Sequence, residues 1–88
     1  MKTIYKYELK MVAHQFVDLP EDSKPLRAEF QNDKLCVWVL IPDTGRFNES
    51  YSFYIIGTGW EMDEDIQPDY ISTVFKDGFV WHIFCDKP

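Results

Sequence analysis

Residues 70–84 read YISTVFKDGFVWHIF, two runs of β-branched and aromatic residues on either side of Asp77-Gly78. Such residues fit the pleated, half-buried surface of a strand, and Asp-Gly between two such runs is a strong signal for a two-residue hairpin turn. The stretch therefore predicts an antiparallel hairpin in which Val74 lies opposite Trp81. It also indicates an all-β fold.

The rest of the chain repeats this pattern. Short strand-like runs are separated by Pro, Gly, Asn and Asp, and no apolar period of 3.6 residues persists as it would in a helix. At 88 residues the chain is expected to form one domain, residues 1–88. We predict a small antiparallel barrel or sandwich of six or seven strands, mostly hairpin-connected. The expected strands are Thr3–Leu9, Leu26–Gln31, Leu35–Ile41, Tyr51–Ile56, Tyr70–Phe75 and Phe79–Phe84, with a further irregular strand within Met11–Leu19.

Residues 26–41 predict a second hairpin, which turns at Asn32-Asp33. Asn and Asp tolerate the left-handed backbone that a two-residue turn requires. A two-residue loop determines which residues of the two arms lie opposite each other. The cross-strand pairs predicted for the two hairpins are Gln31–Lys34, Phe30–Leu35, Ala28–Val37, Leu26–Val39, Val74–Trp81 and Thr73–His82.

Aromatic residues make up 17% of the chain. Each ring buries a large area, so a small β core can be filled by few of them. We expect most rings to lie in the core and the remainder to form a surface that self-association would cover, so a homo-oligomer is expected. Of the two cysteines, Cys36 is expected to pack as a small hydrophobe, and Cys85 to lie at a fraying C-terminus.

The net charge of −6 is unevenly distributed. Acidic and basic side chains balance in residues 1–34, and residues 35–88 carry the whole deficit. A general nucleic-acid binder needs a basic stripe, and anionic membrane surfaces attract basic segments, so both functions are disfavoured. The start of the chain has no apolar leader, and the longest apolar run, Leu35–Ile41, is too short to span a bilayer. A soluble protein of a reducing cytoplasm is expected.

Catalytic and metal-binding motifs are absent from the sequence. Two cysteines alone are too few for a zinc site, and a site on His14 and His82 would need a third and a fourth ligand, with Cys85 the only nearby sulfur in sequence. No motif places a nucleophile beside a histidine and an acid. The sequence predicts a non-enzyme without catalytic residues, metal or cofactor.

Gly57-Thr58-Gly59, directly after a predicted strand, resembles a ligand-binding loop. Two glycines permit close approach of a ligand, and successive backbone amides can bind an anion. The candidate ligand site combines these amides with stacking on Trp60 and with Arg27 or Arg46 against a phosphate. The alternative is that the three residues only form a bend that ends the strand.

Trp60 and Met62 lie in an acidic stretch with Asp63, Glu64 and Asp65. Large apolar side chains in a charged loop often anchor a protein interface. These five residues are therefore the candidate protein interface. Alternatively, Trp60 folds back as a lid over an open end of the core.

Four stretches carry a resemblance to known sequences: Lys2–Tyr7, Phe53–Gly59, Tyr70–Val74 and Phe79–Phe84. They are similar, in the same order, to a family of small, uncharacterised proteins of tailed phages and prophages. The resemblance spans nearly the whole chain, although that family usually continues the Gly-Thr-Gly with His-Pro where this chain has Trp60-Glu61. His82 fits the family pattern and joins the ligand-binding candidates.

The resemblance implies a phage-type accessory protein. Such a protein would be a non-catalytic binding protein that antagonises a host process such as antiviral defence. It would either bind a host protein or sequester a small nucleotide-like signal. The alternative is a minor structural protein of the virion or of its assembly.

Overall fold

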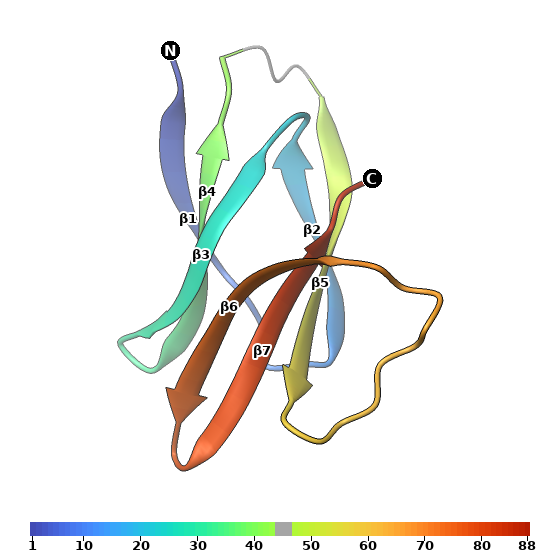
Figure 1. The fold of residues 1–88 in the computed structure, drawn as a ribbon. Helices are drawn as coiled ribbons and strands as arrows, with labels where there is room; N and C mark the ends of the chain where they lie inside the picture. The colour runs from blue at the N-terminus through green and yellow to red at the C-terminus, as the bar shows by residue number, and fades with distance from the viewer. Residues whose placement is uncertain (44–46) are drawn as a thin grey trace.

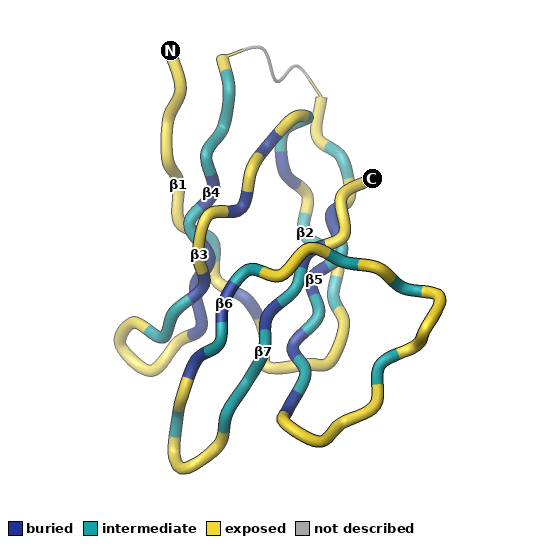
Figure 2. The backbone as a smooth tube through the Cα atoms, in the orientation of Figure 1, coloured by how far each residue is buried: buried dark blue, intermediate teal, exposed yellow. Residues whose placement is uncertain are grey.

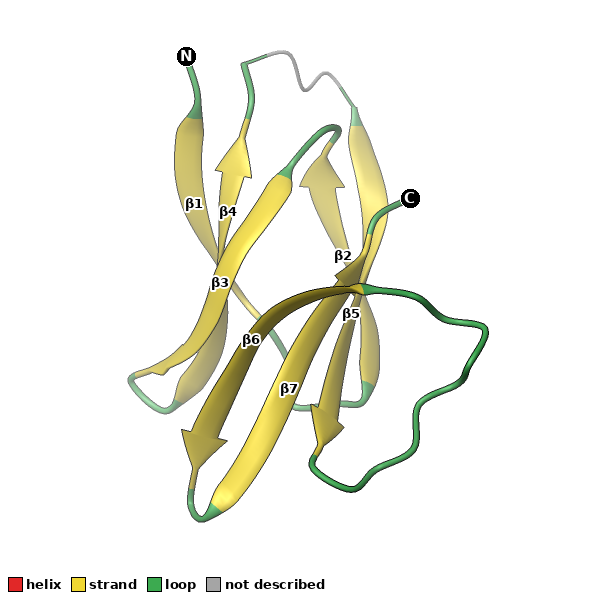
Figure 3. Ribbon diagram, viewed as in Figure 1, coloured by secondary structure: helices red, strands yellow, loops and turns green. Residues whose placement is uncertain are grey.

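A computed structural model describes residues 1–43 and 47–88, which form seven strands and contain no helix (Figure 3). The strands make two antiparallel sheets, with orders β1-β4-β3 and β2-β5-β7-β6 (Figure 1). The predicted all-β class is confirmed, and the two sheets form a sandwich rather than a closed barrel. The strands are β1 (Thr3–Glu8), β2 (His14–Pro20), β3 (Lys24–Gln31), β4 (Lys34–Ile41), β5 (Asn48–Gly57), β6 (Asp69–Lys76) and β7 (Phe79–Asp86).

Consecutive strands often belong to different sheets. The chain passes between the sheets from β1 to β2, from β2 to β3 and from β4 to β5, and β7 lies between β5 and β6. The expectation that hairpins join most strands holds only for β3–β4 and β6–β7. The physical reason is that one sheet of so small a chain can bury its apolar face only against the other sheet.

Both predicted hairpin turns are present. Asn32 and Asp33 have φ angles of 52° and 64°, and Asp77 and Gly78 have 52° and 81°, as the left-handed residues of such turns require. The predicted cross-strand pairs are confirmed except for one.

The pair Leu26–Val39 was wrong. Val39 lies opposite Pro25, and the register shifts between Pro25 and Arg27, so that Leu26 is the extra residue of a bulge. Proline has no N–H to donate to the ladder and is tolerated at such irregular positions of an edge strand.

Buried residues of both sheets form one hydrophobic core, and the buried positions recur along most of the strands in Figure 2. Its aromatic content is small, because only Tyr51 and Phe53 among the rings are fully buried. The expectation that most rings lie in the core was wrong, since strand alternation sends many of them to the outer faces or the ends of the sandwich. The exposed rings are Tyr5, Phe16, Phe47, Trp60, Tyr70, Phe75 and Phe79.

Both cysteines are buried. Cys36 packs as expected, but Cys85 does not lie at a frayed end, because β7 continues to Asp86 between β5 and β6. Cys85 is 1% exposed, and burial raises the pKa of its thiol to about 12. At neutral pH this thiol remains protonated, whereas nucleophilic attack requires the thiolate.

The Tyr51 hydroxyl holds the turn where the chain crosses from β2 to β3. It accepts a hydrogen bond from the Ser23 N–H at 3.1 Å, and the carbonyl oxygens of Pro20 and Ser23 lie 3.4 Å from it as acceptors. Burial raises the pKa of the Tyr51 phenol, so the hydroxyl keeps the proton that it donates. One buried side chain of β5 thereby fixes a connection between the sheets.

A second hydrogen bond joins the sheets where β3 faces β6. The Ala28 N–H donates to the Ser72 hydroxyl oxygen at 2.9 Å, and both residues are buried. Both strands are bulged close to this contact, between Pro25 and Arg27 and between Tyr70 and Ser72. The serine hydroxyl replaces the backbone partner that a continuous sheet would supply.

Replacing Tyr51 by Phe tests the role of its hydroxyl. The substitution keeps the ring in the core but removes one partner of the buried Ser23 N–H, so we expect the free energy of unfolding to fall by about 1–2 kcal/mol. Urea denaturation followed by circular dichroism measures it. Tyr54→Phe, on the outer face, is the control and should change stability by less than about 0.5 kcal/mol. Equal effects of the two substitutions would contradict this role.

Candidate functional site

The Gly-Thr-Gly segment forms a tight turn at the end of β5. The Thr58 N–H donates to the Val80 carbonyl oxygen at 3.2 Å, and the Trp60 N–H donates to the Gly57 carbonyl oxygen at 3.0 Å. Gly59 has a φ of +89°, in the region that favours glycine. One of the amides proposed for anion binding, that of Thr58, is therefore already hydrogen-bonded within the fold.

The position of the Trp60 ring requires a glycine at residue 57. A Cβ atom at Gly57 would lie 2.8 Å from Cε2 of the Trp60 indole, so only glycine leaves room for the ring. The Trp60 ring then meets the Trp81 ring edge-on, with 5.4 Å between centroids and 84° between planes. Trp60 thus folds back over the end of the sandwich, as the lid alternative predicts, yet 55% of its surface stays exposed.

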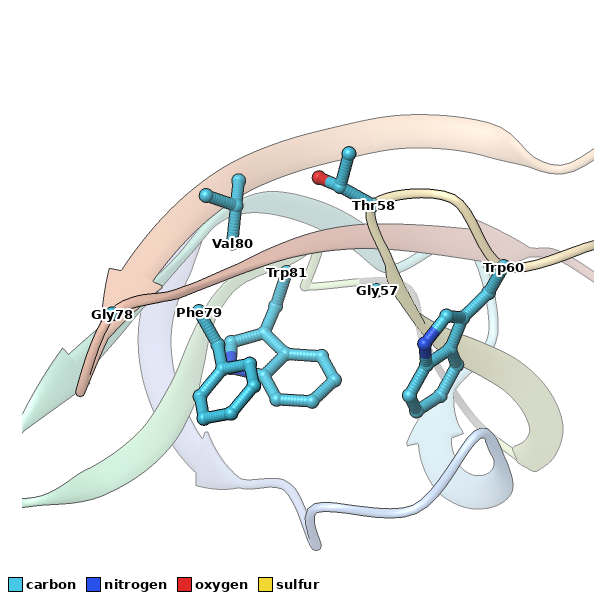
Figure 4. Close-up of a pocket in the computed structure, with 7 residues that line it drawn as sticks. All are labelled: Gly57, Thr58, Trp60, Gly78, Phe79, Val80 and Trp81. Atoms are coloured by element: carbon cyan, nitrogen blue, oxygen red, sulfur yellow. The ribbon is translucent and has the colours of Figure 1, made fainter.

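A pocket of about 320 Å³ opens beside Trp60 (Figure 4). Phe79 and Trp81 project side by side from β7 on one side of it, and Trp60 stands across from them. Phe79 and Trp81 are two positions apart, with Val80 between them, so strand alternation places their side chains on the same face. The lining residues are Gly57, Thr58, Trp60, Gly78, Phe79, Val80 and Trp81.

A smaller hollow of about 140 Å³ also borders Trp60 and Trp81. Its lining includes Met11, Val12 and Ala13, from the segment that joins β1 to β2. Met11, Val12, Trp60 and Phe79 are all exposed. We call the surface formed by Met11, Val12, Trp60, Phe79 and Trp81 the Trp60 end.

His82 lies on the opposite, outer face of the four-stranded sheet. A hydrogen bond of 2.8 Å joins its Nε2 to the Thr58 hydroxyl, and one of 3.1 Å joins its Nδ1 to the Thr73 hydroxyl. His82 therefore contacts Thr58 of the candidate ligand loop but does not line the pocket. Its ring ties β7 to β6 and to the turn after β5.

His14 also contacts a hydroxyl, because 3.1 Å separates its Nε2 from the Ser52 oxygen. Its ring stacks on Tyr54 at a centroid distance of 4.6 Å. Among residues 1–43 and 47–88, neither imidazole is hydrogen-bonded to a carboxylate, which a Ser–His–Asp arrangement needs to orient the base. In the same part of the chain, no three His, Cys, Asp or Glu side chains are grouped to hold a metal ion.

Of the two arginines proposed for phosphate binding, Arg27 is not among the residues that line the pocket. Arg27 lies on the three-stranded sheet and forms an ion pair with Glu29 at 2.7 Å. Arg46 lies outside the described residues. The structure therefore brings together Gly57, Thr58 and Trp60 of the proposed ligand site.

The acidic part of the candidate interface lies in the segment between β5 and β6. Asp63, Glu64 and Asp65 are exposed, and Met62 is half-buried. The Asp63 carboxylate accepts a hydrogen bond from the Asp65 N–H at 2.9 Å, which shapes the segment locally. These residues lie shortly after Trp60 in the same acidic segment.

Sequence reasoning missed Phe79 and Trp81 as site residues. The signal that could have found them is that Trp81 lies opposite Gly57 across the β5–β7 ladder. A large ring facing a glycine leaves space above the glycine, and Trp60 occupies that space. The pairing of β5 with β7 had to be known first.

The described residues contain no helix that is both long and apolar enough to pass through a membrane.

Gly57→Ala tests the placement of Trp60. Because the added methyl would overlap the indole, we expect Trp60 to leave Trp81, and the near-ultraviolet dichroism of the pair to fall. Acrylamide quenching of tryptophan fluorescence should rise. The control compares Trp60→Leu with the double variant that carries both Trp60→Leu and Gly57→Ala. Without the indole, adding the alanine should change the dichroism and the quenching little further. An unchanged spectrum in Gly57→Ala would contradict the contact.

Comparison with known proteins gives a single result. No curated protein and no solved structure matches this chain. The model of one family, described as "Domain of unknown function (DUF7352)", matches residues 1–88. The chain therefore belongs to the DUF7352 family of domains of unknown function.

Proposed function

We propose that this protein is a phage-type, non-catalytic binding protein that works in the cytoplasm of a host cell. It antagonises a host process, such as antiviral defence, by binding a host protein through the Trp60 end. The single observation that carries this proposal is the cluster of Trp60, Phe79 and Trp81 around an open pocket at one end of the sandwich.

The chemistry of this surface supports a protein partner. Tryptophan and other aromatic residues are enriched among the residues that dominate binding energy at interfaces, especially where they line pockets. Met11 and Val12 extend the apolar area next to Trp60. The exposed acidic residues 63–65 follow in the same segment as Trp60, and protein interfaces commonly combine an apolar centre with a polar rim.

A nucleotide-like ligand receives less support. Phosphate groups are bound by free backbone amides and by arginine or lysine. Here the Thr58 and Trp60 amides are already hydrogen-bonded, and Arg27 is paired with Glu29 on the other sheet. We therefore favour a host protein over a nucleotide signal as the partner.

A non-catalytic role is consistent with the titratable groups. The Cys85 thiol is buried with its pKa raised to about 12, and the two imidazoles bond to hydroxyl groups. Neither imidazole lines the pocket at the Trp60 end.

Host-protein capture by the purified chain tests the proposal. We expect the wild-type chain to retain a defined host protein at fixed stoichiometry, and Trp60→Ser and Phe79→Ser to weaken that binding at least about tenfold. Phe47→Ser removes an equally exposed ring from the opposite end of β5 and is the matched control. The proposal fails if no partner is retained, or if all three variants bind it like the wild type.

We further propose that the protein self-associates through the outer face of the four-stranded sheet. One rung across this sheet consists of rings, because His14 pairs with Tyr54, Tyr54 with Phe84, and Phe84 with Tyr70. Tyr70 of this rung is exposed, and so is Phe16, whose ring contacts His14. Contiguous exposed rings of this kind mark interaction surfaces, and a minor virion or assembly protein, the second candidate function, would also use one.

Native mass spectrometry tests the self-association. We expect a multiple of the 10.5 kDa chain mass for the wild type and for Phe47→Ser, and the monomer for the double variant with Phe16→Ser and Tyr70→Ser. A monomeric wild type would contradict the interface. Detection of the protein in purified phage particles would favour the virion role, and its absence there would favour the accessory role.

A further inference from the structure

The pocket at the Trp60 end has the form of a corner made of aromatic rings. Trp60 and Trp81 stand at 84° to each other, while Phe79 is tilted by 33° from Trp81 with 5.9 Å between centroids. The three side chains thus make two walls that meet nearly at a right angle (Figure 4). Ring faces carry partial negative charge and attract cations placed within about 6 Å.

No cation of the described chain occupies this corner. Lys76, which lies opposite Phe79 in the β6–β7 ladder, instead donates a hydrogen bond to Asp33 at 2.8 Å. Its ammonium group lies over the Phe30 ring at 5.3 Å. The bond to Asp33 raises the pKa of Lys76 and the same bond lowers the pKa of Asp33, so the pair stays ionised.

The charge beside the pocket is negative. Glu61 follows Trp60 and Asp77 precedes Gly78, so an acidic residue adjoins the pocket in sequence at each of these positions. The segment from Trp60 to Asp69 contains five acidic and no basic residues. The field of such a surface concentrates cations and repels phosphates and carboxylates.

The size of the pocket limits the ligand. At about 320 Å³ it lies at the lower end of the range for small-molecule sites, about 300–1,000 Å³. It has room for the end of one side chain.

We infer that the corner of Trp60, Phe79 and Trp81 is a cation-binding pocket that takes an ammonium or guanidinium group, the end of a lysine or arginine side chain of a basic protein. This inference rests on the proposed function, because it names the chemistry of the partner that the Trp60 end binds. The Trp60 ring forms one side of the pocket, and it can lie there because Gly57 has no side chain.

Matched small probes separate charge from apolar contact. Choline and 3,3-dimethylbutanol have the same shape, and only choline is charged. We expect titration followed by tryptophan fluorescence or by NMR to show choline bound between about twofold and thirtyfold more tightly, the factor that a cation–ring contact provides. Equal binding of the two probes, or no binding of choline, would overturn the inference.

Amino-acid probes identify the natural group. The Nα-acetyl amides of lysine and arginine should bind, and those of Nε-acetyl-lysine and citrulline, which are uncharged, should bind more weakly. A preference for lysine would indicate an ammonium ligand, and a preference for arginine a guanidinium ligand. Binding of the charged and uncharged forms with equal affinity would count against a cationic partner.

Variants locate the effect in the corner. Trp60→Leu and Phe79→Leu keep apolar side chains at exposed positions but remove ring faces, and each should reduce the preference for choline over 3,3-dimethylbutanol. Trp38→Phe, on the three-stranded sheet, is the control and should retain the preference. A preference that survives both leucine substitutions would place the cation elsewhere and overturn the inference.

The outcomes distinguish the two proposals. Suppose that Trp60→Ser no longer captures the host protein while the wild type binds charged and neutral probes equally. The proposed function would then stand, and the cation pocket would be refuted. Suppose instead that the chain clearly prefers choline but captures no host protein. The cation-pocket inference would then stand, and the protein-binding function would be refuted.

Discussion

The two sheets share one layer of buried side chains, and the rest of the structure depends on keeping that layer closed. The chain crosses between the sheets three times, so each sheet is assembled from distant parts of the sequence. The Tyr51 hydroxyl anchors one crossing and the Ser72 hydroxyl joins β6 to β3. These buried polar contacts matter because an unpaired N–H inside the sandwich would cost stability.

The thin core explains why the protein exposes so many rings. A layer filled mainly by aliphatic residues, with Tyr51 and Phe53, leaves little room for further aromatics. Trp60, Phe79 and Trp81 accordingly gather at one end of the sandwich, where the core finishes, and another group covers the outside of the four-stranded sheet. Large exposed rings in a small protein are the main reason to propose that it works by binding.

Part of the candidate site was accessible from the sequence. Trp60 and Gly57 were identified because a tryptophan and glycines stood out in a polar segment, and the structure places both at the same pocket. Phe79 and Trp81 were missed because most rings were expected to lie in the core, and alternation along a strand does not show where the core ends. Arg27 was selected for its charge alone, and it lies on the other sheet.

Local chemistry in the sequence determined the strands, the two hairpin turns and nearly all of their register, because turn residues and two-residue alternation act between near neighbours. Only the tertiary structure decided the division into two sheets, the bulge at Leu26, the burial of Cys85 and the meeting of Trp60 with Trp81. Each of these depends on which distant strand lies alongside. Alternation assigns a residue to a face of its strand, but the partner strand and the opposite sheet determine what that face meets.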